Sequence, residues 1–505
     1  MTATKAWHTR LTLAVVIVAA ASLRFCNLTA GYPHRVGADE PVIVEHALQI
    51  LRSGDFNPHF YDYPSLYIYL QAAVAAARFL SGAMSGEWQR LSAFTPHDVY
   101  PWTRALNAAL GTFTVYLTYR AGLRWGVWTA ITAAALLAFW GNHVRESHFA
   151  LTDVPLTALV AAVLVASLRT TEDPRPRQFA LAGMLAGLAA AVKYNGAISL
   201  VMPLISAALA APVSAFWTRA AATVAGAAAA YLVAAPYTIL DLPGFLDGFA
   251  FLSQSYRPRP LANGLGIYAG HMAGSIGWPA VALVATGLLW RLVRRVRGQS
   301  RAKPLLLAAF PLVYLYVIAT KHLIYARYLL PILPNVAIAL AALLTDLTTA
   351  ISRASWRPRW TRIAVVACLW GIATLKLGTT SVTWVHRQGA RTTQDVAYQA
   401  LRAFVPPGTT VAVEHGVMWL PERDYRTLPV QSLAERTPEQ YLAAGVRYVV
   451  GTSDAYGRVL DGGAGNASKQ ARYRALFDEP SVCLPPFKPH GRILGPEIRI
   501  CRLDG

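Results

Sequence analysis

The chain has 505 residues, of which 55% are hydrophobic and only 14% are charged, whereas about 25% are charged in an ordinary soluble domain. This composition excludes a disordered chain and argues against a soluble enzyme of ordinary make-up. The apolar residues form runs long enough to cross a bilayer, which takes about 20 apolar residues per helix. We therefore predict an α-helical polytopic membrane protein.

The chain is strongly basic, with 46 lysines and arginines, 26 acidic residues and a formal net charge of +20. In a soluble protein this excess would indicate nucleic acid as a partner. Here most basic residues lie in short connectors between apolar runs, where they set the orientation in the membrane. We therefore predict no nucleic-acid partner.

The first apolar run, residues 11–28, follows Lys5 and Arg10. We interpret it as an uncleaved membrane span with the N-terminus inside rather than as a signal peptide. Further runs begin near Pro64, Trp102, Gly126, Val154, Phe179, Gly196, Ala220, Gly274, Pro304, Tyr328 and Ile363.

Basic connectors at residues 175–177, 291–303 and 353–362 are predicted to lie inside. The loops at residues 241–271 and 321–327, and everything after about residue 380, then lie outside. An inside N-terminus and an outside tail require an odd number of spans, but the apolar runs are even in number. We expect one run between Pro64 and Leu200 to be re-entrant, interfacial or split, and about 11–13 spans in all.

The composition changes near residue 386, so we predict a membrane domain at residues 1–385 and an extracytoplasmic domain at residues 386–505. In this tail, residues 411–413 and 446–450 predict short buried strands, and residues 392–404 and 438–444 predict helices. The tail is therefore expected to be a small α/β domain.

Two of the four cysteines, Cys483 and Cys501, lie in the tail. They can pair if the tail faces an oxidising compartment, and two free thiols are the alternative. None of the four cysteines forms a C-x-x-C pair, so the sequence gives no support for a zinc or redox site.

The first outside loop carries two adjacent acids, Asp39 and Glu40, followed by Pro41 and an amphipathic segment over residues 42–51. The helical spacing of its apolar residues predicts a short helix on the membrane surface. Helix capping by Asp39 is one interpretation. Capping needs only one acid, so a functional role for the pair is the other.

Three further polar residues stand at or inside apolar runs. Asp62 precedes the second run, and Asp153 begins a later one, where helix capping is again the alternative role. Lys193 interrupts the run over residues 179–211. A lysine there costs about 2.5–3.5 kcal/mol unless it reaches water or a partner, so it either snorkels or binds an anionic ligand.

Cations also lie on the predicted outside, although the positive-inside bias disfavours them there. Lys321 and Arg327 belong to one loop, and Arg257 and Arg259 belong to an Arg-Pro-Arg-Pro sequence. Phosphate is the natural partner of such cations, and a solvated loop is the alternative for the arginine pair. A carboxylate can act as general base toward a hydroxyl, and cations can neutralise a phosphate leaving group. The combination suits group transfer from a lipid phosphate.

In the order of its motifs the sequence resembles the GT-C class of polytopic glycosyltransferases, specifically the protein O-mannosyltransferases and aminoarabinose lipid A transferases. The likeness covers about residues 10–346. Its motifs are the acids Asp39-Glu40, the segment led by Pro64, Thr-Asp-x-Pro at Asp153, Gly-Leu-Ala-x-x-x-Lys-Tyr-Asn at Lys193, and Arg-Tyr-x-Leu-Pro at Arg327.

The resemblance implies a GT-C fold and transfer of a sugar, with inversion, from a polyprenyl-phosphate donor to a lipid, glycan or protein acceptor. The reaction would take place on the extracytoplasmic face of the inner (plasma) membrane. Asp39 matches the family's catalytic acid and would be the general base. The sequence departs from the aminoarabinose transferases at Asp62, near which they carry a Glu-Lys pair before proline, and in its Arg-Pro-Arg-Pro loop.

We therefore expect a catalytic centre of Asp39, Glu40 and Asp153. The expected substrate-binding residues are Asp62, Lys193, Arg257, Arg259, Lys321, Arg327 and Tyr328. No cofactor is predicted with certainty, because a divalent metal ion would require Asp39, Glu40, Asp62 and Asp153 to converge. The alternative function is a transporter or flippase of lipid-linked sugars, which would place polar residues near the midplane between broken helices.

Overall fold

The computed structural model describes residues 3–34, 37, 39–293, 302–353, 358–460, 467–478 and 482–503. The chain divides into two compact units. The helical unit comprises Met1–Leu28 and Asp39–Trp384, and the tail unit comprises Thr29–Ala38 and Val385–Gly505. The sequence predicts a boundary near residue 386 but gives no sign that Thr29–Ala38 packs with the tail.

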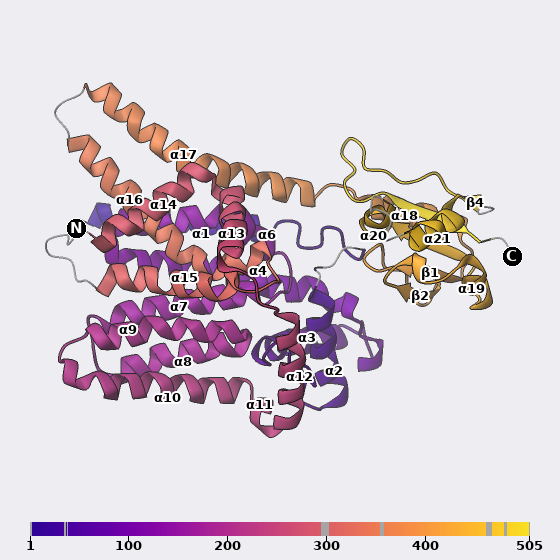
Figure 1. Ribbon diagram of the computed structural model, residues 1–505, viewed down its shortest axis with the longest axis horizontal. Helices are drawn as coiled ribbons and strands as arrows, with labels where there is room; N and C mark the ends of the chain where they lie inside the picture. Colours follow the sequence, from indigo (N-terminus) through magenta and orange to yellow (C-terminus); the bar gives the residue numbers. More distant parts are fainter. Residues whose placement is uncertain are drawn as a thin grey trace. The chain divides into compact units, whose positions relative to one another are not determined.

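The helical unit consists of α-helices, many of which run side by side (Figure 1). Their bounds are α1 Ala3–Phe25, α2 Glu40–Ser53, α3 Leu66–Met84, α4 Pro96–Gly122, α5 Val127–Ala138, α6 Gly141–Glu146, α7 Asp153–Thr170, α8 Pro176–Val192, α9 Val201–Leu209, α10 Phe216–Ala234, α11 Tyr237–Leu240, α12 Leu242–Ser255, α13 Leu261–Ile276, α14 Trp278–Val293, α15 Ala302–Ala319, α16 Leu333–Arg353 and α17 Arg359–Gln388. Short 3-10 helices lie at Leu91–Ala93 (η1), Leu123–Trp125 (η2), Tyr194–Leu200 (η3), Val213–Ala215 (η4) and Ala326–Ile332 (η5).

Small residues let the helices approach closely. A Cβ atom on Gly183 or Gly187 of α8 would collide with the backbone of Thr223 or Ala227 on α10. The two glycines are four residues apart and so share one face of α8. Close packing through a small-xxx-small face is typical of membrane helices, which gain little from a hydrophobic driving force between one another.

Five of the described helices are long and apolar enough to cross a membrane. They are Trp7–Phe25, Leu66–Met84, Asp153–Thr170, Ala326–Arg353 and Arg359–Gln388. The pair α13 and α14 gives a sixth if it counts as one span, bent by 112°. Shorter apolar helices lie at Val127–Ala138, Pro176–Val192, Tyr194–Leu209 and Lys303–Ala319. The prediction of a polytopic helical membrane protein is confirmed, and the exact span count stays a prediction.

Breaks inside apolar runs explain why several helices are short. The helix α5 ends at Ala138, where the buried guanidinium of Arg24 donates to the carbonyls of Leu137 and Ala138 at 3.1 Å each. These carbonyls are among those that a helix end leaves unpaired. A second break occurs at Lys193, whose backbone is extended between α8 and η3. One interruption was expected between Pro64 and Leu200, and the breaks at Ala138 and at Lys193 both lie in this range.

The amphipathic helix after Asp39 is confirmed as α2, which buries Val44, Ala47 and Leu48. Residues 241–271 do not form the predicted loop, because this stretch forms α12 and most of α13, and its location outside stays a prediction. Its sequence is itself apolar, and only the Arg-Pro-Arg-Pro segment between the two helices is irregular.

The tail unit is an α/β domain, as predicted. Its sheet has the strand order β2-β1-β3-β5-β4. Strands β1–β3 are parallel, and β5 is antiparallel to both β3 and β4. The strands are β1 Thr410–Glu414, β2 Arg426–Val430, β3 Tyr448–Thr452, β4 Val482–Cys483 and β5 Ile498–Arg502. The helices are α18 Thr393–Phe404, α19 Pro438–Ala443, α20 Ser453–Leu460 and α21 Ala467–Phe477, with a 3-10 helix, η6, at Leu433–Glu435.

Both predicted strands and both predicted helices of the tail are confirmed as β1, β3, α18 and α19. The two cysteines that the sequence left open form a disulfide, Cys483–Cys501, which links β4 to β5.

Candidate active site

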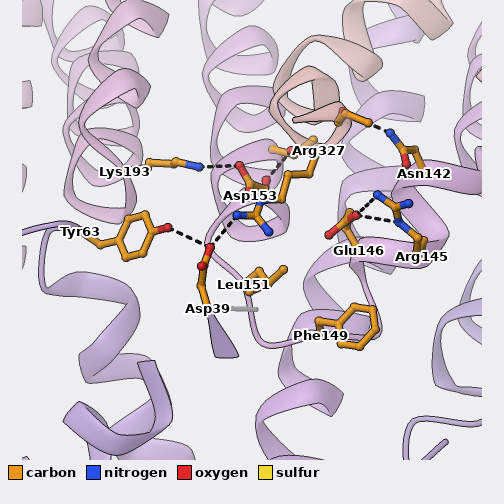
Figure 2. A network of polar contacts seen from close by, with 12 residues as sticks. Asp39, Tyr63, Asn142, Arg145, Glu146, Phe149, Leu151, Asp153, Lys193 and Arg327 are labelled. Atoms are coloured by element: carbon orange, nitrogen blue, oxygen red, sulfur yellow. Dashed lines mark hydrogen bonds and ion pairs between the residues drawn. The ribbon is translucent and has the colours of Figure 1, made fainter. Parts of the chain in front are cut away.

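Four charged side chains from four separate elements form one network in the helical unit (Figure 2). Asp39 precedes α2, Asp153 begins α7, Lys193 lies at the break after α8, and Arg327 lies in η5. Arg327 donates from Nη2 to Oδ2 of Asp39 at 2.6 Å, and its Nε lies 3.5 Å from Oδ2 of Asp153. Nζ of Lys193 donates to Oδ1 of Asp153 at 2.7 Å. Two carboxylates are thus balanced by two cations.

Asp39 is the open end of this network, with a side chain that is 32% exposed. It occupies the N-cap position of α2, but its side chain makes no capping hydrogen bond. Its Oδ2 accepts from Arg327 and, at 3.1 Å, from the hydroxyl of Tyr63. In the described parts of the chain Oδ1 accepts no hydrogen bond. The capping interpretation of the Asp39 side chain is therefore wrong, and Oδ1 has no hydrogen-bond partner among the described residues.

Asp153 and Lys193 are the buried end, with side chains only 3% and 9% exposed. The N-cap of α7 is Thr152, so capping does not account for the carboxylate of Asp153. The ammonium group of Lys193 lies 4.5 Å from the ring centroid of Tyr328 and 5.7 Å from that of Tyr63. Lys193 therefore does not snorkel, because its charge is compensated inside the protein by a carboxylate and two aromatic faces.

Glu40 points away from this network. It is fully buried, and it accepts from Nε and Nη2 of Arg104 at 2.8 and 2.9 Å and from the backbone amide of Ala150 at 2.9 Å. The carboxylate of Glu40 is thus buried and held by Arg104 and Ala150, and its expected catalytic role stays a prediction. No group of three or more His, Cys, Asp or Glu side chains within the described ranges is arranged to hold a metal ion. Asp39, Glu40, Asp62 and Asp153, the acids considered as metal ligands, therefore form no such group in the described ranges.

Asp62 lies in the loop before α3 and is half-buried. Burial, and after it the negative charge of Asp39, raises the pKa of its carboxyl group above the ordinary value. None of the hydrogen bonds or ion pairs formed by described residues involves this carboxylate. Among the described residues it is therefore a second acid beside the network that forms no ion pair.

The predicted outside cations come together through the backbone. Pro258 and Lys321 form an antiparallel bridge, and the amide of Arg259 donates to the carbonyl of Thr320 at 2.7 Å. Arg257, Arg259 and Lys321 make no ion pair with any described acid. Arg257 and Arg259 lie in one loop, and Lys321 and His322 lie in the other. We call these two segments the basic pair of loops. A cavity of about 560 Å³, lined by Phe251, Gln254, Arg257, Pro258 and His322, opens at this place.

An apolar groove adjoins the network. It has a volume of about 570 Å³ and is walled by α13, α14, α15, η5 and α16. The η5 helix links the two features, because Arg327 enters the charged network, Tyr328 covers Lys193, and Leu329 lines the groove.

Sequence analysis missed several residues that build the site. Tyr63, which stands in the loop before α3, donates to Asp39. Asn142 of α6 donates to the carbonyl of Ala326 at 3.2 Å and so helps to place η5. The pair Arg145 and Glu146 lies on the same side of Arg327 as Asn142 (Figure 2). The sequence shows the type of each of these residues, but it does not indicate where each side chain points.

A family model described as dolichyl-phosphate-mannose-protein mannosyltransferase matches residues 44–248. This range contains Asp62, Asp153 and Lys193 but not Asp39 or Arg327. No curated protein sequence matches the chain.

Several solved structures are similar. ArnT from Cupriavidus metallidurans in the apo state has a TM-score of 0.59 at 16% identity, over 100% of this chain and 99% of that chain. The same protein bound to undecaprenyl phosphate gives 0.57 at 16% identity, over 99% of each chain. AglB, the oligosaccharyltransferase of Archaeoglobus fulgidus, in complex with an inhibitory peptide and a dolichol-phosphate, gives 0.56 at 12% identity, over 93% of this chain and 72% of that chain. The chain therefore has the GT-C fold, and the resemblance inferred from its motifs is confirmed.

Proposed function

We propose that the protein transfers a sugar from a polyprenyl-phosphate donor to a hydroxyl of an acceptor, with Asp39 as the general base. The observation that carries this proposal is the carboxylate of Asp39. One of its oxygens is fixed by Arg327 and Tyr63, and the other has no partner among the described residues. A base needs this combination of a fixed position and an open lone pair.

The surroundings of Asp39 suit an amphiphilic donor. The charged network and the apolar groove are joined by three consecutive residues, 327–329. A ligand that fills both would have a polar head at the network and an apolar chain in the groove. ArnT from Cupriavidus metallidurans was solved with undecaprenyl phosphate, a lipid of this type.

The basic pair of loops suits the phosphate. Lys193 and Arg327 are already balanced by carboxylates, whereas Arg257, Arg259 and Lys321 have no described acidic partner. As the bond between sugar and phosphate breaks, negative charge grows on the phosphate, and fixed cations stabilise it. We therefore assign these three residues to the donor phosphate, as expected from the sequence.

In the proposed reaction the acceptor oxygen bonds to the anomeric carbon while the bond from that carbon to the phosphate oxygen breaks. Oδ1 of Asp39 takes the hydroxyl proton, and the polyprenyl phosphate leaves with the bonding electrons. A retaining reaction would require a second carboxylate as nucleophile. Asp153 is the other acid in the network, but Lys193 and Arg327 occupy it. This favours direct displacement, which inverts the sugar carbon.

The other expected site residues take supporting roles in this proposal. Asp153 and Lys193 fix Arg327 from the buried side, and Glu40 fixes the start of α2 through Arg104. Asp62 has no described cation partner and is assigned to hydroxyl groups of the substrate. The acceptor is a lipid, a glycan or a protein.

The test is transfer by purified protein in nanodiscs, with polyprenyl-phosphate sugars as donors. We expect a glycosylated acceptor and an equal amount of released polyprenyl phosphate, both measured by mass spectrometry. Glycolipids and glycoproteins from cells with and without the gene would identify the sugar and the acceptor. Movement of labelled donor across vesicles without any glycosylated product would instead favour the flippase alternative.

Replacing Arg327 should show that its forked shape matters. Arg327 contacts Asp39 and Asp153 from different nitrogens, whereas lysine offers one point charge. We expect Arg327→Ala to lower kcat/KM for the donor by the equivalent of about 1.5–3 kcal/mol, which is typical for a hydrogen bond between charged groups. Arg327→Lys should recover little of this loss. The exposed pair Arg124–Glu172 offers Arg124→Lys as a matched control, and full rescue by lysine would contradict the role of the fork.

The proposed orientation places the site and the tail unit outside the cytoplasm. The disulfide in the tail unit supports this, since such bonds persist in oxidising compartments. In a background with Cys26 and Cys368 replaced by serine, Ala262→Cys and Ser453→Cys should react with an impermeant thiol reagent in intact cells. Gln299→Cys, which lies outside the described residues, should react only after permeabilisation. Labelling of position 299 in intact cells would reverse the orientation.

A further inference from the structure

Tyr268 of α13 is buried, with only 2% of its surface exposed. Its hydroxyl has no hydrogen-bond partner within the described part of the protein. A buried polar group in this state has lost its hydrogen bonds to water without gaining a replacement, which destabilises the folded protein. Such groups are rare in folded proteins, so this one calls for a specific explanation.

The position of Tyr268 suggests which group could accept a hydrogen bond from its hydroxyl. Tyr268 lines the apolar groove, and every other described residue that lines it lacks oxygen and nitrogen in its side chain. The side chains that line the groove are therefore apolar apart from this one hydroxyl. Tyr268 lies about two turns into α13, which begins at Leu261 directly after the segment that carries Arg259. Leu329, two residues after Arg327 of the network, lines the same groove, so Tyr268 lies toward the end of the groove that adjoins the charged residues.

We propose that the hydroxyl of Tyr268 donates a hydrogen bond to the phosphate of the donor lipid. This inference rests on the proposed function. An isoprenoid chain has no hydrogen-bond acceptor, so it would leave the hydroxyl as unsatisfied as it is in the free protein. The phosphate is the first acceptor beyond the chain, and at the junction of groove and network it would lie within reach of Tyr268. The hydroxyl thus marks where the lipid chain ends and the head group begins.

The test is the binding of a short-chain polyprenyl phosphate, compared with the uncharged alcohol of the same chain, to purified wild-type protein and Tyr268→Phe. The variant keeps the ring and its packing and removes only the hydroxyl. We expect affinity for the phosphate to fall by roughly 10- to 100-fold, as for other hydrogen bonds to charged groups, and affinity for the alcohol to be unchanged. Tyr316→Phe on α15, where the residue is 59% exposed, should leave both affinities unchanged.

Thermal unfolding of the free protein separates this role from a structural one. If the hydroxyl is unsatisfied without donor, Tyr268→Phe should unfold at the same temperature as wild type or at a higher one. A lower unfolding temperature would mean that the hydroxyl already has a partner and would overturn the inference. Equal phosphate affinity in wild type and variant would also overturn it and leave the proposed function intact. If the wild-type protein binds the phosphate no better than the alcohol, both the inference and the proposed function are overturned.

Discussion

Asp39→Asn is expected to lower turnover by about 10²–10⁴-fold, which is the usual contribution of a general base. Asparagine has nearly the same shape, and its side-chain oxygen can still accept from Arg327 and Tyr63. It cannot take a proton from the acceptor hydroxyl. Donor affinity and thermal stability should therefore change little, so that the loss appears in kcat. The measurement is transfer by purified protein at saturating donor, with thermal unfolding recorded alongside.

Two further variants make this result specific. Glu45→Gln changes an exposed carboxylate of the same helix and should leave turnover unchanged. Asp62→Asn changes the half-buried acid beside Asp39 and should have a smaller effect than Asp39→Asn. If instead Asp62→Asn or Asp153→Asn abolishes turnover while Asp39→Asn is nearly normal, the base has been assigned to the wrong carboxylate.

The sequence predicted the residue types of the site better than their partners. Asp153 and Lys193 were identified from their position at or inside an apolar run, and Asp39 and Arg327 from their position in predicted outside loops. Their convergence was not predicted, because hydrophobic periodicity describes single elements and says nothing about contacts between segments far apart in the chain. The ion pair between Lys193 and Asp153 also depends on the break after α8, where the backbone of Lys193 becomes extended.

The sequence also did not determine where each side chain points. Asp39 and Glu40 are neighbours and were expected to act together. Successive residues at a helix start point about 100° apart, so one carboxylate faces the network while the other faces α4. A cluster of tyrosines at the start of an apolar run is typical of an interfacial aromatic belt. Here, however, the hydroxyls of Tyr61, Tyr63, Tyr67 and Tyr69 donate to defined acceptors: Asp241, Asp39, Asn107 and the carbonyl of Phe56. Belts and polar networks use the same residue type.

Glu40→Gln is expected to destabilise the protein by about 3–5 kcal/mol, because it removes the carboxylate that balances the buried guanidinium of Arg104. The side chains of Glu40 and Arg104 are 0% and 2% exposed, so water cannot solvate the guanidinium that remains. Glutamine can still accept from the amide of Ala150, which preserves the local backbone. The measurement is the unfolding temperature in detergent, together with turnover per folded molecule. Turnover should fall far less than in Asp39→Asn.

The paired variant Glu40→Gln/Arg104→Gln decides whether the charge is the cause. It buries two amides and no net charge, and amides can hydrogen-bond to each other, so part of the lost stability should return. Arg104 also donates to the carbonyl of Leu28 at 2.9 Å, where the first segment of the helical unit ends. Because the double variant loses this hydrogen bond as well, the recovery of stability should be incomplete. A double variant that is less stable than either single variant would mean that the two residues act independently. Glu40 would then owe its burial to packing alone, and its proposed role in fixing the start of α2 beside Asp39 would lose its physical basis.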